Sequence, residues 1–271
     1  MRKYKLLAID IDGTLIRSDQ TIAPRTRTAL ISAQEQGVQV VITTGRPTYG
    51  AAPFADDLRL SDFSSHVISF NGSEICNWAT KSIIHSVRLD SDILPYVYAS
   101  ATQHGFQVLA YIGQNVVAED PSNEYVAFSS ARNKMPVRQV RNFLADVDGA
   151  QPKFLVVGDP EPLHRLEQEM AEYLKGRAEV YRSEPFFLEV VPHGVDKATG
   201  LAVLSAKLGI SRDAIIAFGD GFNDVSMIEY AGMGVAMGNA QQVVKDRADY
   251  VTLSNEEDGI AAVVEQFLAL K

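Results

Sequence analysis

Two carboxylates, Asp10 and Asp12, follow an apolar stretch near the start of the chain and are separated only by Ile11. The stretch Leu6–Ile9 is apolar throughout, which is typical of a strand buried on both faces. Side chains two residues apart on an extended chain point the same way. We therefore expect both carboxylates at the carboxyl end of one strand, where open α/β sheets bind their ligands. Two acids this close repel each other unless a cation or a shared proton separates them, so the pair suits a hard metal ion and an attacking carboxylate.

Three further groups of polar residues lie where predicted strands end or a predicted helix begins. They are Thr44 with Gly45, then Lys197, and then Asp220 with Asn223 and Asp224. Taken singly, each group is common in ordinary turns and helix starts, just as a lone Asp-x-Asp is common in solvated turns. In a parallel sheet, however, the carboxyl ends of the strands converge on one crevice. The joint occurrence therefore predicts a single site.

This set of side chains suits the binding and transfer of a phosphoryl group. Asp10, Asp12 and Asp220 offer hard oxygen ligands of the kind that Mg²⁺ takes together with waters and a substrate phosphate oxygen. Thr44 and the backbone N–H groups that follow it can bind phosphate at a helix N-terminus. Lys197 is a point charge for phosphate, and it would also offset the cluster of acids.

Alternating strands and helices are predicted to position these groups. The first segment is predicted as strand, helix, strand, helix and strand over residues 6–9, 24–36, 38–43, 47–58 and 67–70. The pattern resumes with a helix over 197–208, a strand over 215–219, a further helix, short strands near Val235 and Tyr250, and a helix over 259–270. A βαβαβ order predicts a parallel sheet with right-handed crossovers.

The middle of the chain has a different character. Strands over 107–112 and 115–118 indicate a hairpin, and residues 162–174 have the pattern of an amphipathic helix. Further elements are predicted as strands over 82–89, 153–157, 179–182 and 187–191 and a helix over 92–104. We therefore expect an α/β fold, a doubly wound parallel sheet formed by residues 1–82 and 191–271, with an α+β domain inserted over residues 83–190.

Composition narrows the possible partners and the setting. The chain has 271 residues and a formal net charge of −9 with no basic tract, which argues against nucleic acid and against an anionic membrane surface. Cys76 is its only cysteine, so an internal disulfide is impossible and a reducing, cytoplasmic setting fits. We expect no signal peptide and no membrane span, because the sequence has neither pattern.

The order of the motifs resembles that of the haloacid-dehalogenase superfamily of phosphotransferases. The motifs are Asp10-Ile-Asp-Gly-Thr14, Thr44-Gly-Arg46, Lys197 and Gly219-Asp-Gly-Phe-Asn-Asp224. The insert falls between the Thr44 and Lys197 motifs, which is similar to the position of a C2 cap in that superfamily. Four shorter phrases are similar to the Cof-type branch of sugar-phosphate phosphatases: Asn71-Gly72, Ala236-Met-Gly-Asn-Ala240, Ala248-Asp249 and Asp258-Gly259.

The resemblance implies a role for each acidic residue of the motifs. Asp10 would be the nucleophile that forms an aspartyl-phosphate. Asp12 would protonate the leaving oxygen and then activate water, and its backbone carbonyl would contact Mg²⁺. Asp10 and Asp220 would ligate Mg²⁺, and Asp224 would ligate the ion or orient the groups around it.

The resemblance also implies which residues hold the phosphoryl group. They are Thr44, Gly45, Lys197 and Asn223, which would contact phosphate directly or, for Asn223, through Lys197. Arg46 is interpreted as a residue that packs or hydrogen-bonds within its loop and is left outside the catalytic set. Asn71-Gly72 is interpreted as a turn, although its location permits substrate contact.

Together these features imply a Mg²⁺-dependent phosphomonoesterase that hydrolyses a small phosphorylated metabolite, with sugar phosphates as the first class. Three alternatives stay open: a sugar phosphomutase, a phosphatase of a pyridoxal-phosphate-type cofactor, and a non-enzymatic regulator that binds a phosphometabolite. A dehalogenase is disfavoured because Asp12 supplies an acid and base that phosphate-ester chemistry needs. The sequence indicates neither the particular substrate nor the oligomeric state.

Overall fold

The chain folds into two compact units. A computed structural model describes residues 3–268. The first unit comprises the chain up to His85 and again from Asp196, and the second comprises Ser86–Val195. The boundaries expected from the sequence, after residues 82 and 190, each cut a strand, because β5 covers Ser82–Ser86 and β11 covers Phe187–Pro192.

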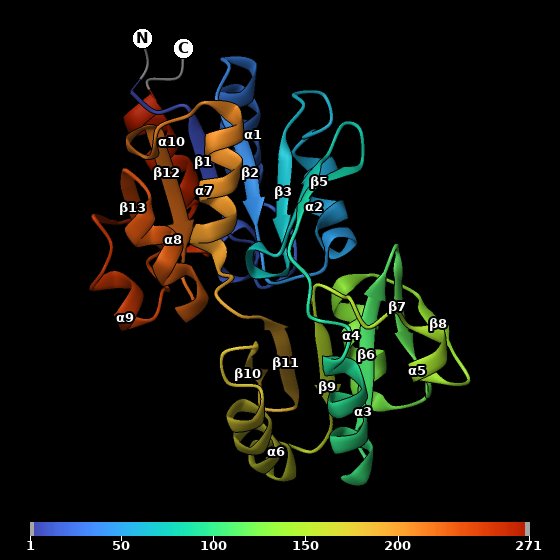
Figure 1. Ribbon diagram of the computed structural model, residues 1–271. Helices are drawn as coiled ribbons and strands as arrows, with labels where there is room; N and C mark the ends of the chain where they lie inside the picture. Colours follow the sequence, from blue (N-terminus) through green and yellow to red (C-terminus); the bar gives the residue numbers. More distant parts are fainter. Residues whose placement is uncertain (1–2, 269–271) are drawn as a thin grey trace. The chain divides into compact units, whose positions relative to one another are not determined.

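A single sheet of eight strands forms the centre of the first unit (Figure 1). In spatial order its strands are β14 Tyr250–Val251, β13 Met233–Ala236, β12 Ile215–Gly219, β1 Leu6–Ile9, β2 Gln39–Thr43, β3 His66–Ser69, β4 Glu74–Asn77 and β5 Ser82–Ser86. The ladder from β14 to β3 is parallel, and β3 pairs with β4 in the antiparallel direction. The predicted doubly wound parallel sheet is confirmed.

The order of the strands reverses at β1. The chain proceeds from β1 to β2 and β3 on one side, and from β12 to β13 and β14 on the other. Such a switch point is where open α/β sheets bind ligands, in the crevice outside the carboxyl ends of the strands. Asp10 follows β1 and Asp220 follows β12, so the sequence places its acids at this point.

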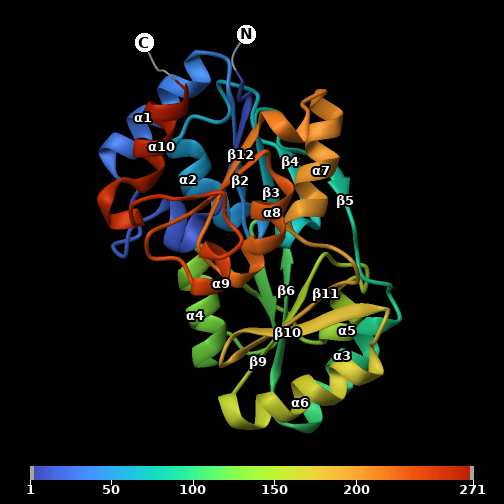
Figure 2. The same ribbon diagram turned by 90° about the vertical axis from the view of Figure 1, so that its left-hand side faces the viewer.

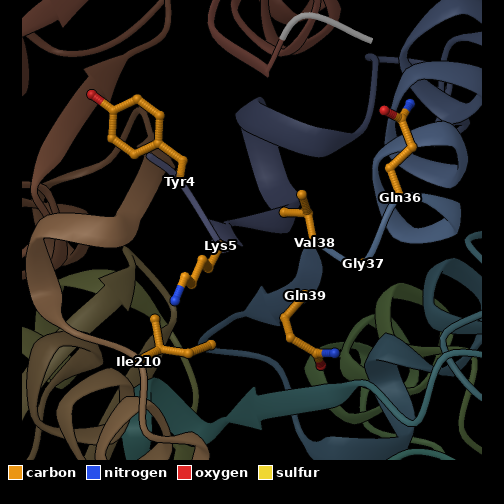
Figure 3. Close-up of a pocket in the computed structure, with 7 residues that line it drawn as sticks. All are labelled: Tyr4, Lys5, Gln36, Gly37, Val38, Gln39 and Ile210. Atoms are coloured by element: carbon orange, nitrogen blue, oxygen red, sulfur yellow. The ribbon is translucent and has the colours of Figure 1, made fainter. Parts of the chain in front are cut away.

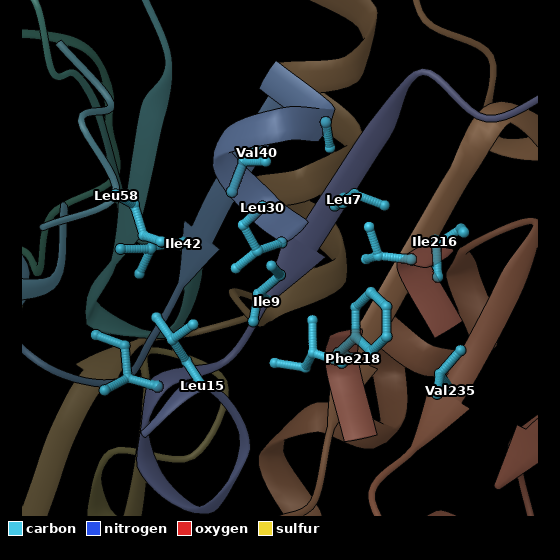
Figure 4. Packing of buried hydrophobic residues seen from close by; sticks show 14 of the residues in the cluster. Leu7, Ile9, Leu15, Leu30, Val40, Ile42, Leu58, Ile216, Phe218 and Val235 are labelled. Atoms are coloured by element: carbon cyan, nitrogen blue, oxygen red, sulfur yellow. The ribbon is translucent and has the colours of Figure 1, made fainter. Parts of the chain in front are cut away.

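Helices cover both faces of this sheet, and alternate residues of β1 face them. Leu7 and Ile9 belong to a core cluster that includes helices α1 Pro24–Glu35, α2 Ala52–Asp57 and α10 Gly259–Leu268 (Figure 4). Leu6 and Ala8 belong to another cluster with α7 Lys197–Leu208 and α8 Val225–Tyr230. Figure 2 shows α1 and α10 on one side of the sheet and α7 and α8 on the other. A strand buried on both faces can therefore be apolar throughout.

Two predicted elements differ clearly from the structure at one end. The helix expected over 47–58 is a 3₁₀ turn at Thr48–Ala51 followed by the short helix α2, because Pro53 in the first turn of α2 suits a helix start and not a helix interior. The strand expected over 82–89 ends at Ser86. The last helix is described to Leu268, so the predicted residues 269–270 lie outside the described part.

The second unit is built on a mostly antiparallel sheet of six strands. Their order is β10 Ala178–Glu184, β11 Phe187–Pro192, β9 Phe154–Val157, β6 Gln107–Ile112, β7 Asn115–Ala118 and β8 Val137–Gln139. Helices α3 Ile93–Gln103, α5 Phe143–Asp146 and α6 Pro160–Tyr173 share one buried cluster with the sheet. Helix α4 Glu124–Asn133 contacts β7 and β8, and this helix, α5 and β8 were not predicted from the sequence.

The described residues contain no helix that is both long enough and apolar enough to cross a bilayer.

Candidate active site

A buried lysine joins two aspartates at the switch point of the sheet. The Lys197 Nζ donates to Asp10 Oδ1 and to Asp224 Oδ1, each at 2.6 Å. Asp10 follows β1, Asp224 precedes α8, and Lys197 is the first residue of α7. Lys197 and Asp224 are fully buried, and Asp10 is 6% exposed. Three residues from distant parts of the chain therefore meet in one charged group.

Burial determines the direction of the pKa shifts in this group. Burial, and next the charge of Asp224, raises the pKa of Asp10 well above its ordinary range, although Lys197 acts in the opposite direction. Burial would lower the pKa of Lys197, but the two carboxylates outweigh it and raise this pKa. The lysine is therefore a permanent cation, and burial favours the neutral form of Asp10.

Asp220 lies beside this group and is held by the turn that follows β1. Its Oδ1 accepts a hydrogen bond of 2.7 Å from the buried Thr14 Oγ1. Gly13 has a φ of +77°, and a Cβ built on it would lie 2.3 Å from Asp220 Oδ2. Only glycine permits both this backbone conformation and this approach. Burial is the largest cause that raises the pKa of Asp220, to about 6.

Three carboxylates converge closely enough to share a cation. One ligand atom each from Asp10, Asp220 and Asp224 lies within 4.8 Å of the other two. The second oxygen of Asp224, Oδ2, accepts from the backbone N–H of Asp220 at 3.0 Å and of Gly221 at 2.9 Å. Asp224 thus makes three hydrogen bonds within the protein, counting Lys197, and its carboxylate is fixed before any ligand arrives.

The start of helix α7 determines where Lys197 lies. Asp196 caps this helix by accepting from the Thr199 backbone N–H at 2.7 Å, and its own N–H donates to Thr199 Oγ1 at 2.9 Å. This reciprocal pair is a capping box. A Cβ on Gly72 would lie 2.1 Å from the Asp196 carbonyl oxygen, so the turn after β3 packs directly against this helix start.

The turn after β2 places Thr44 and Gly45 next to Asn71. Thr44 is buried, its carbonyl accepts from the Asn71 backbone N–H at 3.0 Å, and its Oγ1 accepts from the Arg46 N–H at 3.1 Å. The Asn71 Oδ1 in turn accepts from Asn223 Nδ2 at 3.0 Å. A Cβ on Gly45 would lie 3.0 Å from that Asn71 oxygen. Asn71 therefore joins the β2 turn to the turn that carries Asn223.

Asp12 has a different partner from the other acids. Its carboxylate accepts two hydrogen bonds from the Arg46 guanidinium, from Nε to Oδ2 at 2.8 Å and from Nη2 to Oδ1 at 2.6 Å. Its side-chain carboxylate is absent from the group of three acids that could share a cation among the described residues. The Asp12 side chain is 35% exposed, whereas that of Arg46 is 5% exposed.

Sequence reasoning missed three residues of this site. Arg46 was left out because an arginine in a Thr-Gly-Arg turn gives no sign of its partner, and Thr14 because a threonine after a glycine is common in turns. Asn71 is predicted as a turn residue whose location permits substrate contact, and its φ of +52° agrees with the turn, but its hydrogen bond to Asn223 is not predicted. A usable signal is that Thr14 and Arg46 both lie within two residues of a predicted site residue.

A separate surface pocket has no part in this site. It has a volume of about 400 Å³ and is lined by residues 4–5, 36–39 and Ile210 (Figure 3). These residues lie where β1 and β2 begin, whereas Asp10 and Thr44 lie where the two strands end. The pocket is therefore at the opposite edge of the sheet and contains none of the predicted site residues.

A doubly wound sheet with buried acids and a lysine hydrogen-bonded together at its switch point is typical of α/β enzymes. The family model described as haloacid dehalogenase-like hydrolase matches residues 7–264. The chain belongs to this family and is a hydrolase of the phosphatase type. The family identity agrees with the resemblance seen in the sequence motifs.

Similar proteins cover almost the whole chain. A Bacillus subtilis protein named 5-amino-6-(5-phospho-D-ribitylamino)uracil phosphatase YcsE is 33% identical over 97% of this chain and 96% of its own. The Escherichia coli pyridoxal phosphate phosphatase YbhA is 30% identical over 97% of this chain and 98% of its own. A crystal structure of a haloacid dehalogenase-like hydrolase from Bacteroides thetaiotaomicron has a TM-score of 0.95 and 45% identity, covering 97% of this chain and 99% of that one.

Proposed function

We propose that the protein is a Mg²⁺-dependent phosphomonoesterase that acts on a small phosphorylated metabolite through an aspartyl-phosphate on Asp10. The observation that carries the proposal is the Asp10–Lys197–Asp224 group beside Asp220. A nucleophilic carboxylate, a buried cation for phosphate and a hard oxygen ligand set are the parts that such a reaction needs.

The donor set fits Mg²⁺. Its three converging side chains offer carboxylate oxygens alone, which hard divalent cations prefer. The raised pKa values of Asp10 and of Asp220, caused first by burial, also fit, because a bound cation would favour the charged form of both carboxylates. Asp10 and Asp220 would hold the ion together with the Asp12 backbone carbonyl, and Asp224, occupied by Lys197 and two N–H groups, would orient them. When bound, Mg²⁺ would offset negative charge on the phosphoryl oxygens.

The protein residues then act in two successive steps. An Asp10 oxygen attacks phosphorus and forms an O–P bond, while the bond to the leaving oxygen breaks and Asp12 delivers a proton to that oxygen. Lys197, Thr44, the Gly45 N–H and Asn223 hold the phosphoryl oxygens. Asp12 then takes a proton from water, which attacks the aspartyl-phosphate and releases inorganic phosphate. The Asp10 carboxylate is regenerated in this second step.

Sugar phosphates are the first class of substrate that we propose, and a pyridoxal-phosphate-type cofactor is the second. Among the relatives, YcsE is named for a substrate with a phosphorylated ribityl chain, and YbhA is named for pyridoxal phosphate. The second unit would be a C2-type cap that contributes contacts to the leaving group. A cytoplasmic location is part of the proposal, because small phosphorylated metabolites are found there.

The test is hydrolysis of a panel of sugar phosphates, pyridoxal phosphate and para-nitrophenyl phosphate, each with Mg²⁺ and with a chelator. We expect phosphate release that requires Mg²⁺, and we expect Asp10→Asn to abolish it. Asp62→Asn is a matched control, because Asp62 is an exposed partner of Arg59 outside the site. Full activity of the Asp10→Asn protein, or full activity in chelator, would overturn the proposal.

A further inference from the structure

The Arg46 guanidinium binds the Asp12 carboxylate in a geometry that fixes the orientation of the carboxylate. Two nitrogens of one guanidinium donate to the two oxygens of one carboxylate, at 2.8 Å and 2.6 Å. A planar fork of this kind restricts rotation of the carboxylate in a way that a single contact or a lysine cannot. Asp12 is therefore held in one orientation before any substrate binds.

The exposure of the two partners shows which of them is the anchor. The Arg46 side chain is 5% exposed, and its guanidinium lies 5.2 Å from the centre of the Phe54 ring. Its Nη2 also donates to Gln20 Oε1 at 3.2 Å. The Asp12 side chain is 35% exposed. The guanidinium is thus fixed from within the protein, while the carboxylate is the partner that a substrate can reach.

Arg46 also organises the neighbouring hydroxyl, but through its backbone. Its N–H donates to Thr44 Oγ1 at 3.1 Å, and its carbonyl accepts from the Phe70 N–H at 3.0 Å. A substitution of the Arg46 side chain keeps both backbone groups. It therefore separates any effect on Asp12 from an effect on the Thr44 hydroxyl.

We propose that Arg46 is the positioning residue of Asp12, and that it aims this carboxylate for proton transfer to and from the oxygens at phosphorus. The inference rests on the proposed function and deepens it. In the first step the proton goes from Asp12 to the leaving oxygen as the P–O bond breaks, and in the second step Asp12 takes a proton from the attacking water. Both transfers need the carboxyl group within hydrogen-bond reach of the oxygen, so orientation matters in each.

Comparing substrates with a good and a poor leaving group distinguishes this positioning role from a merely structural one. A nitrophenolate leaves without much help from an acid, whereas an alkoxide needs its proton. We expect Arg46→Met to lower kcat/KM for benzyl phosphate by about 10²-fold, the scale of a misplaced catalytic group. For para-nitrophenyl phosphate, a compound of similar size, the loss of kcat/KM should be several times smaller.

A double-mutant comparison tests whether Arg46 acts through Asp12. In the Asp12→Asn background, where no carboxyl is left to aim, Arg46→Met should produce no further loss with either substrate. Arg46→Lys keeps a cation but loses the two-nitrogen contact, so it should show the same dependence on the leaving group. It replaces Arg46→Met in the test if that variant folds poorly. Arg25→Met is the matched control, because Arg25 makes a similar two-nitrogen contact with Glu265 on an exposed surface outside the site, and its loss should leave both rates unchanged.

The outcomes distinguish this inference from the function on which it rests. Equal losses with both phosphates, or an added loss in the Asp12→Asn background, would make Arg46 a structural residue and overturn the inference alone. An unimpaired Arg46→Met enzyme beside an impaired Asp12→Asn enzyme would also overturn only the role of Arg46. Undiminished benzyl phosphate hydrolysis by Asp12→Asn would overturn the acid and base role of Asp12 and the inference together. Absence of Mg²⁺-dependent phosphate release by the unsubstituted protein from every phosphate in the panel would overturn the proposed function itself.

Discussion

Lys197 shows how single residues set the chemistry of this site. A buried ammonium would be unstable alone, but two carboxylates at 2.6 Å stabilise its charge. The cluster contains three carboxyl groups against this one ammonium, so an added cation would stabilise the ionised form of all three. At the residue scale the proposed site therefore combines a buried cation that would bind phosphate with a carboxylate cluster that would bind a metal ion.

The stability of the Mg²⁺-free protein is predicted to depend on Asp220. Burial raises the pKa of Asp220 from 3.8 to about 6, so between these pH values the folded state binds more protons than the unfolded state. Stability therefore falls as pH rises through this window, and the cost persists above it. We expect Asp220→Asn to melt a few degrees higher than wild type at pH well above 6 in chelator, with the difference vanishing at pH below 3.8. Melting curves across pH would test this, and a difference that grows toward low pH would contradict it.

The Mg²⁺ dependence of the activity is predicted to change when Asp220 is substituted. Asp220→Ala removes one of the converging carboxylates but leaves Asp10 and Asp224. We expect a lower rate that partly recovers at raised Mg²⁺, because affinity for the ion is lost more than the fold. Titration of activity against Mg²⁺ measures this. A rate that stays low and flat at all Mg²⁺ concentrations would assign Asp220 another role.

Sequence reasoning predicted which residues lie together at the switch point, but not which side chains each of them contacts. Motif order and strand ends identified Asp10, Lys197 and Asp220 as neighbours, because parallel strands deliver their carboxyl ends to one edge. The Arg46–Asp12 pair could not be predicted, since it depends on how two turns fold back on each other, and spacing along the chain says nothing of that.

At the scale of elements, the turn after β1 is tightly constrained by its contacts with Asp220. It must bring Thr14 to Asp220 and pass so close to Asp220 that Gly13 cannot carry a side chain. The ends of the elements were predicted less well than the elements themselves. The prediction of one helix over 47–58 overlooked Pro53, which favours a helix start at α2, whereas the apolar runs of β1 and β2 indicate buried strands directly.

Gly13→Ala is therefore predicted to damage the site, and Gly37→Ala to serve as its control. Both glycines have positive φ, +77° and +85°, so alanine costs each about 1–2 kcal/mol of backbone strain. Nothing lies within 4 Å of a Cβ at Gly37, whereas a Cβ at Gly13 would meet Asp220. We expect both variants to lose stability, but only Gly13→Ala to lose most of its turnover and its response to Mg²⁺. Equal turnover in the two variants would show that the close approach to Asp220 does not matter.

At the scale of the whole molecule, the first unit carries the proposed catalytic residues, and the second unit is proposed to contribute substrate specificity. All of the predicted site residues belong to the first unit, which has its own sheet and its own buried clusters. The second unit has a separate sheet and cluster. The sequence could indicate an insert from its change of pattern, but not its ends, because strands β5 and β11 continue past the expected boundaries.

Removal of the second unit is predicted to leave a slow, unselective phosphatase. Replacing Ser86–Val195 by a short Gly/Ser linker keeps every site residue and the whole first sheet apart from the end of β5. We expect a folded protein that binds Mg²⁺ and hydrolyses para-nitrophenyl phosphate but no longer discriminates among natural phosphates. Excision of residues 83–190 is the control and should fold less well, because it cuts β5 and β11. A truncated protein that keeps its selectivity would place specificity in the loops of the first unit.

Detection of a phosphoryl group on Asp10 tests the central claim most directly. Asp12→Asn should be mixed with para-nitrophenyl phosphate and Mg²⁺, quenched in acid and analysed by peptide mass spectrometry. The first step needs little acid for this leaving group, whereas the second step lacks its base, so the intermediate should accumulate. We predict a burst of nitrophenol and a phosphorylated peptide that carries Asp10, with neither in Asp10→Asn/Asp12→Asn. Turnover with no such adduct, or an adduct on a different residue, would contradict the account.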